Sequence, residues 1–270
     1  MTLLIAAKAG PGLRPNGTDF TFEPGIVMAA DTRLSNTDGT IADDGLKVGI
    51  TGARGICGMA SDSIDIPTRA FHDFDGFMTH YPDVSARDAA VELKRLLTEA
   101  HCYVTSRRAR TDLRTTVFFG HCHPSTKSLS LYCLSSVDGF EPLLRDGFNA
   151  AGSHAHWVIE TFKRIKHEYP TLTLHPFDGF PGNRVPIIEA VAPLVMTIIQ
   201  SAVDIARGEE AARGLRQGIG GTFQAADDAI VFLIASCEVA NTGSYVLPRN
   251  LTDDPSANHA VNPIGSYYNS

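Results

Sequence analysis

The second residue of the chain, Thr2, could act as a catalytic nucleophile if the initiator methionine were removed. Its hydroxyl group would then stand beside the free α-amino group of the same residue. A nucleophilic hydroxyl needs a general base to take its proton, and a neutral amine within reach can do this. One residue would therefore carry both roles in acyl transfer. The plain alternative is a threonine that only begins a strand, a position that suits its β-branched side chain.

Other residues that could do chemistry form weaker patterns. In the run His-Cys-His at 121–123, alternation leaves only the two histidines on one face of a strand, and no spaced second pair of ligands follows. Cys57 could be a nucleophile only with a histidine that the sequence does not identify. The glycine runs at 10–12 and 218–221 lack the strand-to-helix context of a phosphate-binding loop. We therefore expect no metal and no organic cofactor.

The composition indicates a folded protein and argues against several classes of function. The chain has 270 residues, 43% of them hydrophobic, which suits one large domain. Its net charge of −7 argues against a surface for nucleic acid or for membrane lipids. No apolar run is long enough to cross a bilayer and no secretion signal is recognisable, so we expect a cytoplasmic protein. The five cysteines are widely spread without CxxC spacing, which favours reduced, mostly buried thiols.

The elements that must position Thr2 can be read from apolar alternation and turn residues. The first strand would begin at Thr2 itself, and the first four strands would form a β-meander. From Ser61 the apolar spacing becomes helical, with Ser61 or Asp62 as the cap of a first helix and Asp83 or Ser85 as the cap of a second. Strands are expected at 2–9, 25–30, 46–50, 55–60, 115–120, 128–134, 148–151, 222–225 and 229–234, a turn at 138–139, and further helices at 152–167 and 187–207.

This order of elements predicts an α+β fold. Two sheets, each followed by a pair of helices, suggest a four-layer αββα sandwich with helices outside both sheets. We expect one domain over residues 1–240, with insertions near 10–25 and 168–186. Residues 241–270 are polar and contain three prolines, so they are expected to form an extended arm.

Several short motifs carry a resemblance to a known family. They are Thr2, Ala29-Ala30-Asp31-Thr32-Arg33, Lys47, Gly58-Met59-Ala60-Ser61-Asp62 and Ala151-Gly152-Ser153. In order and spacing they resemble the β-type subunits of proteasomes and their bacterial relatives, and the resemblance extends with interruptions to about residue 237. That family belongs to the N-terminal-nucleophile hydrolases. The resemblance implies their αββα fold, a homo-oligomeric ring, threonine peptidase activity on peptides or unfolded proteins, and an ATP-dependent unfoldase as a candidate partner.

The resemblance also implies catalytic roles for five residues. Thr2 would attack the peptide carbonyl group. The ammonium group of Lys47 would keep the threonine amine neutral, and Asp31 would orient Lys47 and offset the cost of its burial. Ser153 would hydrogen-bond near the amine, while the backbone N–H of Gly58 would donate to the developing oxyanion.

By the same comparison, further residues would bind the substrate. Ser35 and the backbone of Gly58 and Ala60 would pair with an extended peptide. Apolar side chains would enter a first specificity pocket, which predicts cleavage after apolar residues. That pocket would be lined by Gly45, Ile56, Ala60 and Ile64.

The chain departs from the family pattern at three points. The connection over residues 10–25 is enlarged, and His154 follows the Gly-Ser pair where the family has a small residue. Arg216 and Ile219 stand where the family has the Asp and Ser that support the threonine amine. Two alternatives therefore stay open. One is a catalytically inactive ring or scaffold subunit, and the other is an N-terminal-nucleophile amidohydrolase or transpeptidase with a narrow substrate range.

Overall fold

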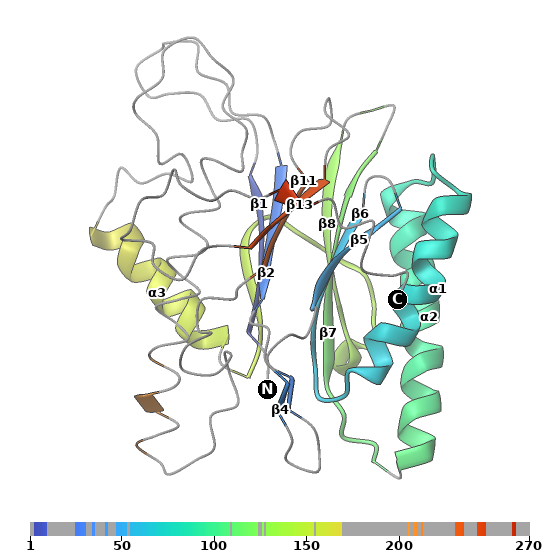
Figure 1. The fold of residues 1–270 in the computed structure, drawn as a ribbon, viewed down its shortest axis with the longest axis horizontal. Coiled ribbons are helices and arrows are strands. Elements are labelled where there is room, and N and C mark those ends of the chain that lie inside the picture. Colours follow the sequence, from blue (N-terminus) through green and yellow to red (C-terminus); the bar gives the residue numbers. More distant parts are fainter. Residues whose placement is uncertain are drawn as a thin grey trace.

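The structure is a computed structural model in which helices pack on two antiparallel sheets, an α+β arrangement (Figure 1). It describes residues 3–9, 25–30, 34–35, 41–42, 47–52, 55–108, 110–123, 126, 128–153, 155–168, 205, 208–209, 212, 230–234, 242–246 and 261–262.

The first sheet contains the strand that follows Thr2. Within the described ranges its strands are β1 (Leu3–Ala9), β2 (Gly25–Ala30), β10 (Gly147–Gly152), β11 (Ile230–Ile234), β12 (Thr242–Val246) and β13 (Val261–Asn262). They lie in the order β10-β1-β2-β11-β12-β13, and every neighbouring pair is antiparallel. We call it sheet 1. β1 is therefore an internal strand, with hydrogen-bonded neighbours on both sides.

The second sheet, sheet 2, lies against sheet 1 and is also antiparallel. Its strands, as far as the structure describes them, are β5 (Val48–Thr51), β6 (Gly55–Ser61), β7 (Thr115–Cys122), β8 (Leu129–Ser135) and β9 (Leu143–Arg145), paired in that order. Two short strands, β3 (Leu34–Ser35) and β4 (Ile41–Ala42), pair with each other. The expected meander is therefore wrong. β1 and β2 belong to one sheet and β5 and β6 to the other, because alternation identifies a strand but not its partner.

Of the expected helix caps, the one at Ser85 is confirmed. α1 covers Asp65–His80, α2 covers Ala86–Arg108 and α3 covers Ala155–Glu168. The hydroxyl of Ser85 accepts a hydrogen bond from the amide of Asp88 (3.1 Å), as an N-cap does. α1 instead starts after Ile64 without a side-chain cap. The expected turn at 138–139 is a 3₁₀ turn, η1 (Ser136–Asp138), closed by Gly139 in a left-handed conformation.

Two apolar clusters hold the layers together. One lies between the sheets and includes Leu4 and Met28 of sheet 1 and Phe118 of sheet 2. The other lies between sheet 2 and the pair α1 and α2, where Phe74 and Phe119 meet edge to face at 5.2 Å. α3 packs on the other side of sheet 1 (Figure 1). The rings of Phe148 and Phe162 stack there with their centroids 4.4 Å apart.

Several expectations fall outside the described residues or differ from the structure. Almost all of the insertions expected near 10–25 and 168–186, the helix expected at 187–207 and the strand expected at 222–225 lie outside them. The strand expected at 229–234 is confirmed as β11, and the one expected at 148–151 is confirmed as β10. Part of the expected C-terminal arm, Thr242–Val246, forms a strand of sheet 1. Its polar sequence hid this strand from a search for apolar alternation.

The cysteines correct another expectation. Cys122 forms a disulfide bond, whereas Cys57, Cys102 and Cys133 are free thiols. The prediction of reduced thiols is thus wrong for Cys122, since a single bond needs no local spacing such as CxxC. Cys102 is exposed rather than buried. None of the described helices is long and apolar enough to cross a membrane.

Candidate functional site

The start of β1 lies at one end of sheet 1, together with the ends of two other strands. Leu3 pairs with Gly152 in β10, and Leu4 pairs with Ala30 in β2. Ser153, which follows Gly152, is exposed at this end. Three residues that the sequence links to catalysis are therefore next in sequence to strand residues at this end of the sheet: Thr2, Asp31 and Ser153. We call it the β1 end.

Sheet 2 reaches the β1 end through β6. A Cβ atom at Gly58 would lie 2.8 Å from Cδ1 of Leu4 and 3.3 Å from Sδ of Met28, so β6 crosses sheet 1 very closely here. A Cβ atom at Gly120, farther from the β1 end, would instead lie 3.2 Å from Ile26. The part of β6 after Gly58 therefore runs over sheet 1 toward the start of β1.

Lys47 belongs to this part of sheet 2. The amide of Met59 donates a hydrogen bond to the carbonyl oxygen of Lys47 (2.8 Å), and Val48 pairs with Gly58. Lys47 is only 4% exposed. Burial of an ammonium group is costly unless an opposite charge or several hydrogen bonds compensate it. A buried lysine at this end of the sheets is therefore expected to have a carboxylate beside it.

A cavity of about 800 Å³ lies beside Lys47, between the β5–β6 hairpin and α1. Apolar and polar groups share its wall. The far end is fixed by the turn between the two strands, where the amide of Gly52 donates a hydrogen bond to Oδ1 of Asp75 (2.8 Å). The lining includes Lys47, Cys57, Met59, Thr68, Phe71 and Asp75.

Three of the four residues expected to line a specificity pocket, Ile56, Ala60 and Ile64, do not line this cavity. Ile56 is fully buried and Ala60 is 6% exposed, and both pack in the cluster between the sheets. Successive side chains of a strand point to opposite faces, so Cys57 and Met59 face α1 and the cavity instead. Ile64 lines a separate groove between α1 and α2. The pairing of Lys47 with Met59 shows which face of β6 lines the cavity, and the sequence alone does not reveal this pairing.

Gly58 does not present its amide to the cavity. The N–H groups of a strand alternate between its two neighbours, and the amide of Met59 points to β5. The amide of Gly58 therefore points to β7, where Phe118 is its partner in the register. In this position Gly58 permits the close approach of the two sheets. Its expected role as an oxyanion donor stays a prediction, because Thr2 lies outside the described residues.

Three of the other expected site residues, Thr2, Asp31 and Gly45, lie outside the described residues. Ser35 is described only through its backbone, which pairs with Ile41.

Cys57 is unsuited to the alternative role of nucleophile. Its side chain is fully buried, and this burial raises the pKa of the thiol far above its ordinary value, although a hydrogen bond from Thr51 acts in the opposite direction. A thiol must lose its proton to attack a carbonyl group. Cys57 is therefore an inert wall residue of the cavity.

The histidines at 121–123 do not form a metal centre with other described residues. His121 is fully buried, and its ring centroid lies 6.5 Å from that of His123. Across the described ranges, no three His, Cys, Asp or Glu side chains come together as metal ligands would.

The chain matches no protein-family model, and no curated protein matches its sequence. A functional assignment therefore rests on the residues of this chain and their arrangement.

Proposed function

We propose that the protein is a threonine-type peptidase of the N-terminal-nucleophile class, with Thr2 as its nucleophile after removal of Met1. The observation that carries the proposal is the β1 end. An internal strand starts there at Leu3, one residue after Thr2, and the buried Lys47 lies in the facing sheet near the same end. The order α3, sheet 1, sheet 2, then α1 and α2 agrees with the αββα sandwich of that class, which we include in the proposal.

In the proposed reaction, Oγ of Thr2 attacks the carbonyl carbon of a peptide bond while the α-amine of Thr2 takes the hydroxyl proton. The proton passes to the leaving amine as the peptide bond breaks and an ester to Thr2 remains. Water then hydrolyses this ester and regenerates the hydroxyl. Lys47 would hold the α-amine neutral by its positive charge, Asp31 would pair with Lys47, and Ser153 would orient the amine.

The cavity beside Lys47 is the proposed binding site for the substrate side chain. Its wall contains Met59 and Phe71, and the inert thiol of Cys57 adds a further apolar group. These residues take the place that the sequence comparison gave to Ile56 and Ala60. The proposed preference for cleavage after apolar side chains is the same as the one expected from the sequence. A homo-oligomeric ring, an unfoldase partner and a cytoplasmic location are part of the same proposal.

Covalent labelling tests the proposal. Protein purified from its own host should lack Met1 by intact mass and should gain one adduct with a β-lactone or epoxyketone inhibitor. T2A should gain none. K47M should slow adduct formation by about a hundredfold, because general acid–base assistance contributes at least that much. K94M is the matched control, since Lys94 is a surface lysine of α2 paired with Glu141. Retention of Met1 on all molecules would rule out the mechanism.

A second candidate is an inactive scaffold subunit with the same fold. Two observations favour it. The amide of Gly58 points into sheet 2, and Arg216 and Ile219 replace the residues that support the amine in the family. The scaffold predicts removal of Met1 without any adduct at Thr2. An adduct formed by a protein that cleaves no unfolded substrate would instead indicate an amidohydrolase or transpeptidase, which a panel of small amides would identify.

A further inference from the structure

A groove of about 590 Å³ lies outside the candidate site, between the start of α1 and the end of α2. Ile64 and the buried Val104 give it an apolar floor. The rim is formed by Thr68, Arg69, Tyr103 and Arg107. Thr68 and Arg69 also line the cavity beside Lys47, so the groove and the cavity are neighbours on the surface.

Two guanidinium groups of the groove lack a carboxylate partner among the described residues. The Cζ atoms of Arg69 and Arg107 lie 4.4 Å and 4.6 Å from the ring centroid of Tyr103, which is 40% exposed. A third guanidinium, that of Arg108, is paired with Asp65. The groove therefore carries three positive charges and one negative charge, although the whole chain has a net charge of −7.

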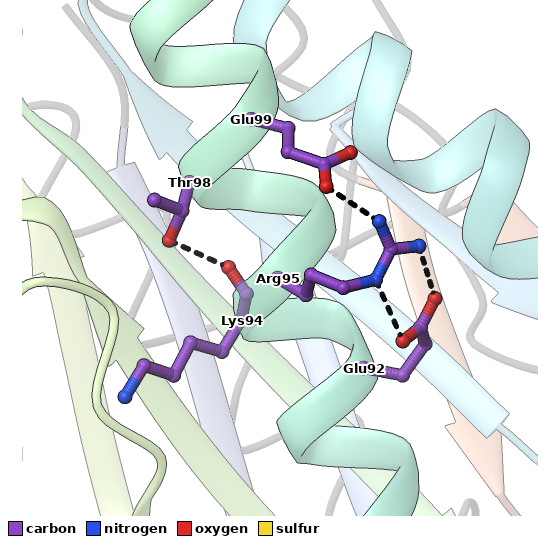
Figure 2. Close-up of polar contacts among 5 residues, drawn as sticks. All are labelled: Glu92, Lys94, Arg95, Thr98 and Glu99. Carbon is purple, nitrogen blue, oxygen red and sulfur yellow. Dashed lines mark hydrogen bonds and ion pairs between the residues drawn. The ribbon is translucent and has the colours of Figure 1, made fainter.

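Another arginine, elsewhere on α2, is paired with carboxylates. Arg95 donates hydrogen bonds to the carboxylates of Glu92 and Glu99, which neutralise its charge (Figure 2). Arg69 and Arg107 instead contact one aromatic ring, which holds two like charges near each other. An anion that contacts both guanidinium groups would relieve that repulsion and would meet donors that the ring already holds in place.

We propose that this groove binds an acidic segment of a partner protein. Its carboxylate groups would accept hydrogen bonds from Arg69 and Arg107, and a neighbouring apolar side chain would rest on Ile64 and Val104. A peptide fits better than a nucleic acid for two reasons. The floor is apolar, and the net negative charge of the chain repels a long polyanion. The inference is independent of any catalytic activity of the protein.

Fluorescence anisotropy with the full-length protein tests the groove directly. The probe is a labelled twelve-residue peptide in which Asp and Glu alternate with Leu, and the matched peptide carries Asn and Gln in place of the acids. We expect the acidic peptide to bind and the neutral one not to bind. R69Q/R107Q should weaken binding by about tenfold or more, since hydrogen bonds to charged groups are lost. R95Q, which removes the same charge from a paired arginine of α2, should change affinity by less than about twofold.

A second variant keeps the test decisive if R69Q/R107Q is poorly folded by circular dichroism. R69K/R107K retains both charges but not the planar donors, so it should bind with an affinity between the other two proteins. Equal binding of both peptides, or no loss in either double variant, would overturn the proposal. So would binding of inorganic phosphate or of an RNA oligonucleotide without binding of the acidic peptide.

Discussion

Substitution of Gly58 by alanine should destabilise the protein through the packing of the two sheets. The new Cβ atom would lie 2.8 Å from Cδ1 of Leu4, which is closer than Cβ atoms come to their neighbours, and 3.3 Å from Sδ of Met28, which is a tight contact. Leu4 and Met28 are both fully buried, so neither side chain can turn away freely. Overpacking of this kind costs about 1–3 kcal/mol of unfolding free energy. Each kcal/mol lowers the melting temperature by about 2–4 °C in a protein of this size.

A double-mutant cycle with L4A identifies the cause. L4A alone should cost about 2–5 kcal/mol because it leaves a cavity between the sheets. In G58A/L4A the added methyl group occupies part of that cavity, so the loss should be smaller than the sum of the single losses by about 0.5–3 kcal/mol. Urea unfolding followed by circular dichroism measures all three values, provided that the slope with urea is unchanged.

A matched glycine gives the control. Gly76 lies in α1, and a Cβ atom there would meet nothing within 4 Å. G76A should therefore stabilise the protein by about 0.5–1 kcal/mol, because alanine is the better helix former. Strictly additive losses in the cycle, or a G58A protein as stable as the wild type, would refute the packing geometry at Gly58.

The remaining predictions concern single side chains. S85A should lose about 1 kcal/mol of unfolding free energy, measured by urea unfolding, because Ser85 caps α2. Iodoacetamide should modify the exposed Cys102 of the folded protein but not Cys57 up to pH 9, since burial raises the pKa of Cys57 and keeps its thiol protonated; equal labelling rates would contradict this. The hydrogen bonds from Arg95 lower the pKa of Glu92, so R95Q should raise that pKa toward its ordinary value in an NMR titration. The resulting stability difference, below about 1 kcal/mol for exposed groups, should be present at neutral pH and vanish as the pH falls through the folded-state pKa of Glu92.

Local patterns were sufficient to predict most of the described elements, but not which strands pair. The cap at Ser85 and the apolar stripe after it identified α2, because both signals lie within one helix. β6 was recognised as a strand, yet its two faces are both apolar. Ile56 and Ala60 face sheet 1 while Cys57 and Met59 face α1, and a strand buried on both sides gives no sign of which face meets a cavity.

The candidate site was predictable only in part, because local motifs do not show which side chains meet in the fold. The sequence motifs point to Thr2 and Lys47, and the structure places Lys47 and Leu3, the residue after Thr2, at the same end of the two sheets. The groove around Tyr103 was missed. Arg69 and Arg107 belong to different helices and form no motif along the chain, so only the packing of α1 on α2 brings them to one ring.

The order of strands in sheet 1 has a consequence for synthesis of the protein. β2 pairs on one side with β11, so Ala30 finds its partner only when Ile230 has been made. At the usual rates of translation this interval is about 10–40 s, during which an apolar strand edge has no neighbour. Contacts between such distant positions also slow folding, because a long loop must close before they form. A chain shortened before β11 would keep that edge permanently open, and it should aggregate rather than fold into a smaller stable unit.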